Sequence, residues 1–384
     1  MHKGKLMASA AVFTVALSVL ISGCSGANSQ PAASQPKASD TPGKAGTPEG
    51  SKLEQLVAAA KKEGSVAVYG PPGEETRRGL TEPFEKKYGI KVQFNGGRSS
   101  EAMAKLKTEH AANKMSGDVM ISGANTGTDL LQAHLSRPVR SELVDPEVLD
   151  EKNWYQGKMQ FVDTEGKFLV KLAQTKSMLS INTDLVKNGD IKSANDLLDP
   201  KWKGKIGVSD PRVAGSGTQT SNFLLHTFGE DYVRKLYIDQ KAEFTRDLRL
   251  LGDNLARGKY AIAIGLDQPT VKGIVDSGVK NIGELDVPEL TITTTGYGNA
   301  SLLDKAPHPN AGALYVNWLL SKEGQTEFAR LFESAPIRRD VPVPKEVSPS
   351  IIPDDKVNYY STVSMEHLEF VIKSQPFFND LIKK

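Results

Sequence analysis

The sequence predicts an α/β protein in which two blocks of alternating helices and strands are joined by extended segments. Three observations lead to this fold class. Short apolar runs of the kind that form buried strands are separated by longer runs whose apolar residues recur at helical spacing. This alternation occurs within residues 53–122 and again within residues 205–277, and extended segments flank the second occurrence. Helices between strands are typical of βαβ units, in which strands pair in parallel.

The first block is expected to begin with a helix at Leu53. Leu53, Leu56 and Val57 recur at helical spacing, and Gly64 stands where a C-cap belongs. The elements that follow alternate between strand and helix, and they are expected at residues 66–69, 74–88, 90–94, 100–113 and 118–122. Pro83 could kink or split the second helix, because proline lacks the N–H that a helix interior uses.

The second block repeats this order. Its elements are expected as strand, three helices, strand and helix, at residues 205–209, 218–228, 231–237, 246–257, 260–264 and 269–277. Residues 168–181 before the block are extended in character, and residues 290–295 after it are rich in β-branched side chains. We expect these two segments to cross between two lobes. Two independent domains in series are the alternative.

The first 23 residues have the three parts of an export signal. A basic start with Lys3 and Lys5 is followed by an uncharged, mostly apolar stretch, and small residues then precede Cys24. The run Ile-Ser-Gly-Cys that ends at Cys24 resembles a bacterial lipobox, in which the cysteine thiol is acylated and becomes the new N-terminus. We therefore predict a lipoprotein signal peptide over residues 1–23 and lipidation, for example by palmitate, at Cys24. A cleaved signal without lipid, or a short anchor helix, is the alternative.

Composition narrows the range of partners. The chain has 48 basic and 46 acidic residues, and removal of the signal peptide would leave the two numbers equal. That balance argues against general nucleic-acid binding, which needs a basic surface. Cys24 is the single cysteine, so the sequence offers no pair for a disulfide. Residues 24–52 contain almost no large apolar side chain, and we expect them to form a disordered tether between lipid and folded body.

Loops that follow the predicted strands are the expected ligand-binding positions, because ligands of open α/β sheets lie beyond the carboxyl ends of the strands. Two of these loops, around Arg98 and Ser216, combine glycines, small hydroxyl residues and an immediately following helix. Free N–H groups and the helix dipole favour an anion there, and the Arg98 guanidinium could hold a carboxylate or phosphate. The predicted ligand-binding residues are Tyr69, Gly70, Arg98, Ser99, Ser100, Ser122, Ser216, Gly217, Thr218, Asp267 and Tyr297.

These positions also have purely structural interpretations. Serine and threonine before a helix often serve only as N-caps, and Tyr69 and Tyr297 could pack without touching a ligand. No catalytic set is found: Ser216 lies between glycines, but not with the G-x-S-x-G spacing of a nucleophile elbow. The six histidines are scattered without metal-ligand spacing. We expect no enzyme activity, no cofactor and no resident metal.

Several segments resemble a known family. They are residues 118–122, 215–219, 308–311 with 318–325, and 335–338. These segments are similar to those of the periplasmic or lipid-anchored substrate-binding proteins of ABC importers, in the ferric-iron-binding-like group, and the resemblance covers nearly all of residues 53–340. It implies a two-lobed α/β fold, the type II periplasmic-binding-protein fold. In that fold, mixed sheets are flanked by helices, two strands cross between the lobes, and the ligand lies in the cleft.

The lobe boundaries that follow are residues 53–170 with 288–335 for the first lobe, and 171–287 with 336–384 for the second. One of the resembling segments also has a structural interpretation from its own residues. We expect an amphipathic helix over residues 308–325, with Pro309 near its start and Leu314, Trp318 and Leu319 on one face. We assign this helix to packing and not to ligand contact.

Ferric-iron members of the group place adjacent tyrosines after the late strand, and this chain does not. Residues 265–270 read Gly-Leu-Asp-Gln-Pro-Thr, and the adjacent Tyr359 and Tyr360 lie in the C-terminal tail. The missing pair therefore favours a small organic anion (a carboxylate, phosphonate or phosphorylated compound) over iron.

We expect the protein to be a monomer that is exported and is either lipid-anchored at the outer face of the cell membrane or periplasmic. It would capture the anion and deliver it to an ABC permease. The alternatives are a ferric-iron-binding transport protein, an exported enzyme acting on a small anion, and an adhesin or sensor.

Overall fold

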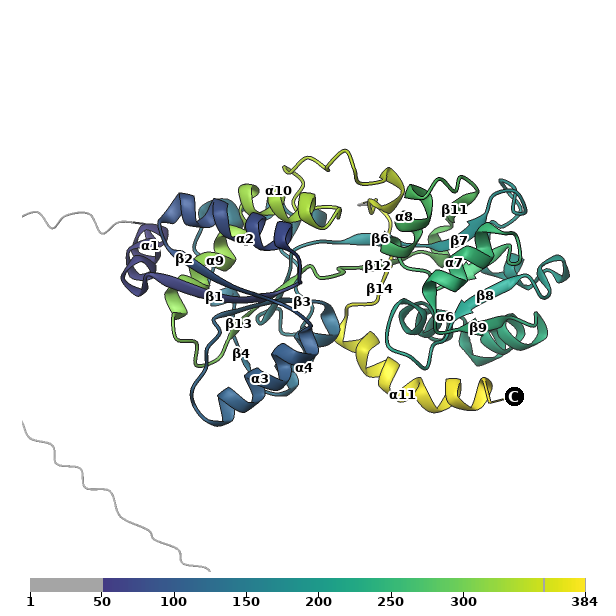
Figure 1. The fold of residues 1–384 in the computed structure, drawn as a ribbon, viewed down its shortest axis with the longest axis horizontal. Helices are drawn as coiled ribbons and strands as arrows, with labels where there is room; N and C mark the ends of the chain where they lie inside the picture. Colours follow the sequence, from purple (N-terminus) through teal and green to yellow (C-terminus); the bar gives the residue numbers. More distant parts are fainter. Residues whose placement is uncertain (1–50, 355, 384) are drawn as a thin grey trace, which may run out of the picture. The chain divides into compact units, whose positions relative to one another are not determined.

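Two sheets, each covered by helices, form the two lobes of the chain, and three short strands run between them (Figure 1). The computed structural model describes residues 51–354 and 356–383. The predicted signal peptide, Cys24 and nearly all of the predicted tether lie outside the described residues.

The first lobe is built on a mixed sheet with the strand order β2-β1-β3-β13-β4, in which β5 also pairs with β13. β1 runs parallel to β2 and β3, whereas β13 runs antiparallel to β3, β4 and β5. The strands are β1 (Ser65–Gly70), β2 (Lys91–Gly96), β3 (Val119–Ser122), β4 (Ser136–Arg137), β5 (Leu169–Lys171) and β13 (Asn299–Leu303).

Apolar side chains alternate between the two faces of this sheet and give it two separate cores. Val119 and Ile121 belong to the larger core, which lies beneath α1, α2, α9 and α10 and in which the ring of Phe84 on α2 packs against that of Trp318 on α9. Met120 belongs to the smaller core beneath α3 and α4. The helices are α1 (Lys52–Glu63), α2 (Glu74–Tyr88), α3 (Ser99–Ala111), α4 (Ala124–Gln132), α5 (Pro146–Leu149), α9 (Pro309–Leu320) and α10 (Lys322–Leu331).

The second lobe has a sheet with the strand order β11-β7-β10-β8-β9. β8 pairs in parallel with β9 and β10, while β7 pairs antiparallel with β10 and β11. Its strands are β7 (Leu179–Asn182), β8 (Ile206–Ser209), β9 (Glu243–Thr245), β10 (Ile262–Ile264) and β11 (Ile282–Leu285). Its helices are α6 (Ser216–Arg234), α7 (Leu248–Ala256), α8 (Gln268–Asp276) and α11 (Met365–Leu381). α11 packs on α6, so the end of the chain belongs to this lobe.

A third sheet connects the lobes. β6 (Thr175–Ser177) pairs antiparallel with β12 (Ile292–Thr294). These two strands lie in the two segments that the sequence predicts to cross between the lobes. β14 (Tyr360–Ser361) adds a third strand, parallel to β12, that the sequence does not predict. A two-residue strand has no usable periodicity, so only its pairing reveals it.

Residues 308–325 do not form the single amphipathic helix expected from the sequence. α9 ends at Leu320, and α10 begins after Ser321, whose hydroxyl accepts the N–H of Gly324. A side chain at Gly324 would meet the carbonyl oxygen of Trp318 at 2.0 Å, so the turn requires glycine there. α9 is buried on all sides from residue 311 to residue 320, which an amphipathic pattern would not allow.

Other boundaries differ in smaller ways. Pro83 lies inside α2, which continues unbroken to Tyr88. The helices expected over residues 218–228 and 231–237 are merged in α6 and the π-helical turn after it, with a non-helical Gly229 between them. α4 and α11 were not expected. Isolated bridges join Trp154 to Arg338 and Ala173 to Pro336, so residues 336–338 lie against these two residues.

The described residues also form eight short helical turns. They are η1 (Arg140–Glu142), η2 (Glu151–Asn153), η3 (Tyr155–Gly157), η4 (Ala194–Leu198), η5 (Pro200–Trp202), the π-turn η6 (Lys235–Asp239), η7 (Pro288–Leu290) and η8 (Pro349–Ile351).

Candidate functional site

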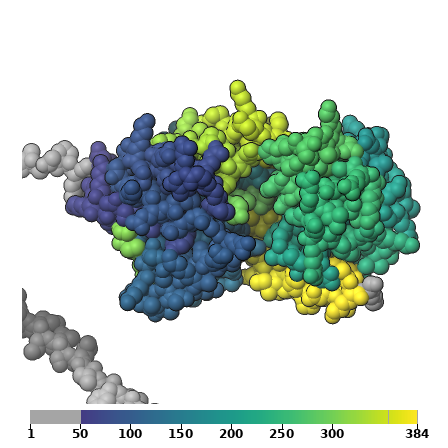
Figure 2. Space-filling model, in the orientation of Figure 1, coloured from purple at the N-terminus to yellow at the C-terminus, as the bar shows by residue number. Residues whose placement is uncertain are grey.

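A hollow opens between the two lobes, with purple and blue residues of the first lobe on one side and green residues of the second on the other (Figure 2). The carboxyl ends of the parallel strands in each lobe lead into helices α2, α3, α4, α6 and α8. The predicted ligand-binding residues lie on these connections or on the crossing segment after β12.

The first turns of four of these helices share one feature. No described side chain caps α2, α3, α4 or α6, which begin after Gly73, Arg98, Gly123 and Gly215. Most other helices are capped by a serine or aspartate, among them α1, α7, α10 and α11. Backbone N–H groups at an uncapped helix start need an acceptor, and an anion supplies one.

In the second lobe, three residues from different segments pack tightly around the start of α6. An added Cβ at Gly217 would lie 2.4 Å from the carbonyl oxygen of Ser209, and one at Gly265 would lie 2.5 Å from the Cα of Gly217. Gly265 also has a φ of 78°, which favours glycine. The glycines therefore bring the end of β8, the end of β10 and the first turn of α6 into direct contact.

The hydroxyl groups in this loop are already used by the protein. Ser216 Oγ donates to the carbonyl oxygen of Gly265 at 2.7 Å, and Thr218 Oγ1 donates to Pro211 at 3.1 Å. Asp267 caps α8 by accepting the N–H of Thr270 at 3.0 Å. What this loop can offer an anion is therefore mainly the backbone N–H groups of α6.

Two arginines that are not among the predicted ligand-binding residues, Arg212 and Arg246, stand beside the same loop. Asp210, which is buried, accepts from Arg212 Nη2 at 2.7 Å and from Arg246 Nε at 3.2 Å. The hydrogen bonds from Arg212 lower the pKa of the Asp210 carboxyl to about 2, so the carboxylate stays ionised. Pairing of Ser209 with Thr245 brings Arg246 to this place, which no local motif reveals.

In the first lobe, Arg98 reaches into solvent. Its side chain is 84% exposed, and among the described residues it forms one ion pair, with Glu101 at 3.8 Å. Ser99 is half-buried and Ser100 is exposed on the first turn of α3. Neither serine is the N-cap, so the capping interpretation does not account for them.

Ser122 is fully buried at the end of β3, and its hydroxyl has no partner among the described residues. Its carbonyl oxygen accepts from Asn299 Nδ2 at 3.2 Å, and Asn299 Oδ1 also lacks a described partner. Gly123 follows, and an added Cβ there would lie 3.3 Å from the carbonyl oxygen of Gly296. Unpaired buried polar atoms are rare in proteins, and they mark this strand end as a place that can accept a ligand or water.

The remaining predicted ligand-binding residues are Tyr69, Tyr297 and Gly70, and each has its own surroundings. Tyr69 is buried, hydrogen-bonds the hydroxyl of Ser116 at 3.0 Å and packs in the smaller core, as its packing interpretation requires. Tyr297 is 49% exposed, with its ring 6.3 Å from that of Phe332. A Cβ at Gly70 would lie 2.7 Å from the ring of Phe94.

The structure therefore groups the predicted residues into clusters and does not join them directly. Ser216, Gly217 and Thr218 meet at the start of α6, and Ser122 lies near the segment before Tyr297. Within the described residues, no hydrogen bond or ion pair connects the Arg98 loop to the Ser216 loop. A ligand between them would have to bridge the hollow.

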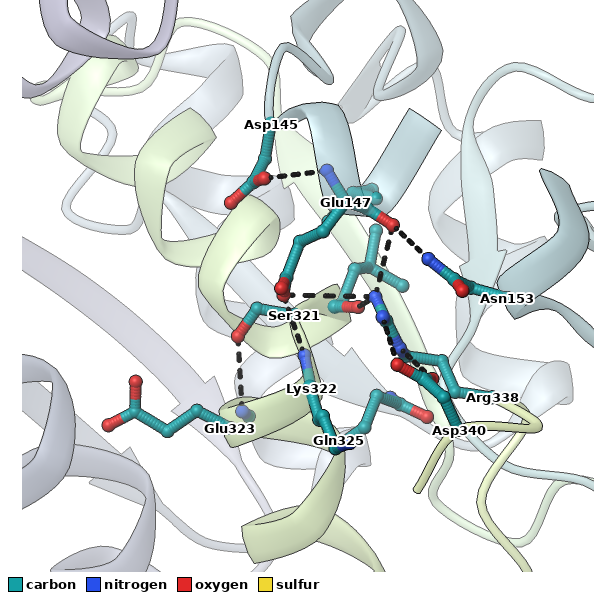
Figure 3. Close-up of polar contacts among 12 residues, drawn as sticks. Asp145, Glu147, Asn153, Ser321, Lys322, Glu323, Gln325, Arg338 and Asp340 are labelled. Atoms are coloured by element: carbon teal, nitrogen blue, oxygen red, sulfur yellow. Dashed lines mark hydrogen bonds and ion pairs between the residues drawn. The ribbon is translucent and has the colours of Figure 1, made fainter. Parts of the chain in front are cut away.

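Residues 318–340 form a separate, structural cluster in the first lobe (Figure 3). Arg338 is 1% exposed and donates to both carboxylate oxygens of Asp340, at 2.8 and 2.9 Å. It also donates to the carbonyl oxygens of Leu320 and Glu147, at 3.1 and 3.3 Å. Arg338, which lies in one of the segments that carry the family resemblance, thus connects α5, α9 and the C-terminal segment.

The adjacent tyrosines of the tail point to different surroundings. Tyr360 hydrogen-bonds Nδ1 of His367 at 2.9 Å, and burial raises the pKa of its hydroxyl to about 12. Tyr359 accepts the N–H of Asp354 at 3.4 Å and lies 6.0 Å from the ammonium of Lys176. The pair therefore does not present two phenolates to one point.

Two features are absent from the described part of the chain. No group of three or more His, Cys, Asp and Glu side chains there could hold a metal ion. None of the described helices combines the length and the apolar character that crossing a membrane requires.

Sequence comparison gives the family. Residues 79–353 match the model of the bacterial extracellular solute-binding proteins. A Salmonella typhi protein named as a 2-aminoethylphosphonate-binding periplasmic protein is 26% identical over 170 residues, which is 42% of this chain and 49% of that protein.

Structural comparison gives the fold. The iron-bound HitA of Pseudomonas aeruginosa is similar with a TM-score of 0.60 and 17% identity, over 83% of this chain and 99% of that one. AfuA of Actinobacillus pleuropneumoniae, solved with fructose-6-phosphate, is similar with a TM-score of 0.57 and 21% identity, over 83% and 98% of the two chains. These likenesses confirm the predicted two-lobed type II periplasmic-binding-protein fold. The family consists of binding proteins and not of enzymes, as expected, and this chain belongs to the bacterial extracellular solute-binding proteins.

Proposed function

We propose that this protein captures a small organic anion between its lobes and delivers it to an ABC importer, while Cys24 anchors it by lipid to the outer face of the cell membrane. One observation carries the proposal of an anion. Helices from both lobes start at strand ends without a side-chain cap, so their N–H groups are left for a ligand.

Arg98 and the unpaired polar atoms at Ser122 add to this. An exposed guanidinium with a single weak ion pair is free to form two hydrogen bonds with a carboxylate or phosphate. The relatives are consistent with such a ligand, because one is named for a phosphonate and another was solved with a sugar phosphate. A carboxylate, a phosphonate or a phosphorylated compound would each present the required charge.

Ferric iron is the second candidate, and it rests on the likeness to iron-bound HitA. The different surroundings of Tyr359 and Tyr360 favour the organic anion, because those hydroxyls do not converge. Titration with ferric citrate decides between the two. A saturable visible charge-transfer band would support iron and contradict an organic anion as the main cargo.

The direct test is calorimetric titration of the mature protein with 2-aminoethylphosphonate, fructose-6-phosphate and citrate. We expect one of these probes to bind, and Arg98→Ala to weaken it about ten- to a hundredfold, the value of a charge-assisted hydrogen bond. Arg98→Lys should recover only part of the affinity. Ser216→Ala should cost less, because its hydroxyl is bonded to Gly265.

Arg78→Ala is the matched control, since Arg78 is also exposed but pairs with Glu82 on α2. It should leave affinity unchanged. An Arg98→Ala variant that binds the probe within twofold of the wild type would contradict the assignment of this loop. Lower apo stability with unchanged affinity would instead mean that the loop only stabilises α3.

A further inference from the structure

A cavity of about 370 Å³ lies beside the crossing strands, and none of the predicted ligand-binding residues lines it. Residues 155–163 of the first lobe form one wall, and residues 357–361 of the C-terminal segment form another. Thr293 of β12 and Ser361 of β14 contribute from the crossing sheet. Its volume falls within the range of small-molecule sites, about 300–1,000 Å³.

Lys171 lines this cavity and is the most unusual residue in it. The residue lies on β5 and is only 9% exposed, yet its ammonium has no hydrogen-bond or ion-pair partner within residues 51–354 and 356–383. Burial lowers the pKa of Lys171 to about 8, because water is lost and no carboxylate replaces it. Lys176, five residues along the chain, is also buried, but its ammonium lies 3.1 Å from Asp286.

Two more polar atoms of the cavity wall are left unpaired. Gln174 Oε1 and Ser361 Oγ are buried without a hydrogen-bond partner among the described residues. An unpaired buried polar group costs about 1–3 kcal/mol, so two such atoms beside the unpaired ammonium of Lys171 are not expected unless something else bonds them. A molecule in the cavity would satisfy all three at once.

The charges around the cavity favour an anion. Arg140 and Lys158 stand with Lys171 on the wall, and Arg140 lies 4.3 Å from the ring of Phe161. The one carboxylate on the described wall belongs to Asp163, and it is occupied. It accepts three backbone N–H groups, from residues 167, 168 and 169, at 2.9–3.0 Å.

We propose that this cavity is a second ligand site, in which the carboxylate or phosphate of a small anion pairs with the ammonium of Lys171. Gln174 and Ser361 would hydrogen-bond the polar part of the same molecule. The aromatic rings of Tyr155, Phe161 and Tyr359 would contact its carbon skeleton. Buried, unpaired ammonium groups are rare because an isolated charge is costly away from water, and an anion removes that cost.

NMR of the lysine side chains in the mature protein tests the proposal, with inorganic phosphate and succinate as probes. In the absence of probe, the Lys171 signal should titrate well below the ordinary lysine range. With probe, the signal should shift saturably and the pKa of Lys171 should rise. The Lys176 signal should not move. An ordinary pKa in the free protein would overturn the proposal, because it would mean that Lys171 already has a partner.

Two variants complete the test. Lys171→Met, which keeps the apolar stem, should weaken binding at this site at least tenfold, whereas Lys176→Met should not. The cavity is not an anion site if neither probe shifts the Lys171 signal at any concentration up to the solubility limit of that probe. The same conclusion follows if the Lys171→Met variant binds the probe as tightly as the wild type does. Arg98→Ala serves to keep the two sites apart, because it should affect only the loops that face the hollow. If no probe binds in the hollow near Arg98, the result for the Lys171 cavity is therefore unchanged. If no probe binds in the Lys171 cavity, the result for the hollow is likewise unchanged.

Discussion

The guanidinium of Arg338 holds the carboxylate of Asp340 through two hydrogen bonds, from Nε at 2.8 Å and from Nη2 at 2.9 Å. Nη1 of Arg338 donates a hydrogen bond to the carbonyl oxygen of Leu320, the last residue of α9. The guanidinium carbon lies 5.4 Å from the centre of the Trp154 ring. The same hydrogen bonds lower the pKa of Asp340. One buried cation thus ties the C-terminal segment to the first lobe.

Replacement of Arg338 should therefore be severely destabilising. We expect Arg338→Ala to lower the free energy of unfolding by about 3–5 kcal/mol, because it leaves buried carbonyl oxygens and a carboxylate without their partner. Arg330→Ala is the control: Arg330 also pairs with two carboxylates but is 46% exposed. It should cost less than about 1 kcal/mol. Equal losses in urea denaturation of the two variants would show that burial of Arg338 is not the cause.

The start of α6 should tolerate no side chain at Gly217. A Cβ there would lie 2.4 Å from the backbone oxygen of Ser209, so Gly217→Ala must push the helix away from β8. We expect a loss of about 1–3 kcal/mol and weaker ligand binding. Gly273→Ala, in an exposed part of α8 with open space at its Cβ, should instead be neutral or stabilise by about 0.5–1 kcal/mol. Thermal melts of both variants measure this, and an unaffected Gly217→Ala would contradict the packing.

Acid should destabilise the second lobe through His367. The ring is fully buried between Tyr360 and Gln219, and burial lowers its pKa from 6.5 to about 4. The unfolded chain then binds more protons between pH 6.5 and 4. Stability is complete above this window and falls as the pH drops through it, by roughly 3 kcal/mol in total.

The measurement is the free energy of unfolding of wild type and His367→Gln across that pH window. The difference between the two proteins should shift by roughly 3 kcal/mol in favour of the variant as the pH falls. His134→Asn, at an exposed position, should follow the wild type. Parallel curves for wild type and His367→Gln would mean that His367 is protonated in the folded protein without penalty.

Membrane association should depend on Cys24. The lipobox-like run predicts that acylation of this thiol, and not a membrane helix, holds the protein at the cell surface. Cys24→Ala should still be exported but should appear in the soluble fraction and lose the lipid, detected by labelled palmitate. Ser25→Ala is the control and should fractionate as the wild type does. A Cys24→Ala protein that remains firmly with the membrane would show that something else anchors it.

Much of the fold follows from local pattern. The apolar runs that end in glycine locate β1, β3 and β10, and helical spacing locates α1, α2 and α8, because each pattern depends on neighbours in the chain. Elements without such a pattern are missed or given wrong limits. β14 has two residues and exists only through its pairing with β12, so the sequence does not predict it. α9 is predicted as part of one helix over residues 308–325, but it is buried all round, so its periodicity does not show that it ends at Leu320.

Some residues of the candidate site can likewise be located from local sequence, and others cannot. The Arg98 and Ser216 loops could be located from sequence, because glycine, hydroxyl and helix start are adjacent there. Arg246 could not, since it reaches Asp210 only through the pairing of β8 with β9. Nor does the pattern around Tyr69 reveal that its ring turns to the smaller core and away from the strand-end loop.

The α/β class, the two blocks and the strand-end loops can be predicted from the chain alone, because they depend on periodicity and on residues close together in the chain. Which of those helix starts lack a cap, and which tyrosines are packed, is visible only in the folded protein. The tertiary structure also brings Lys171, Gln174 and Ser361 around one cavity. Burial and unmet hydrogen bonds depend on what the rest of the folded chain places around a side chain, and Ser361 lines the same cavity as Lys171 although it lies 190 positions further along the sequence.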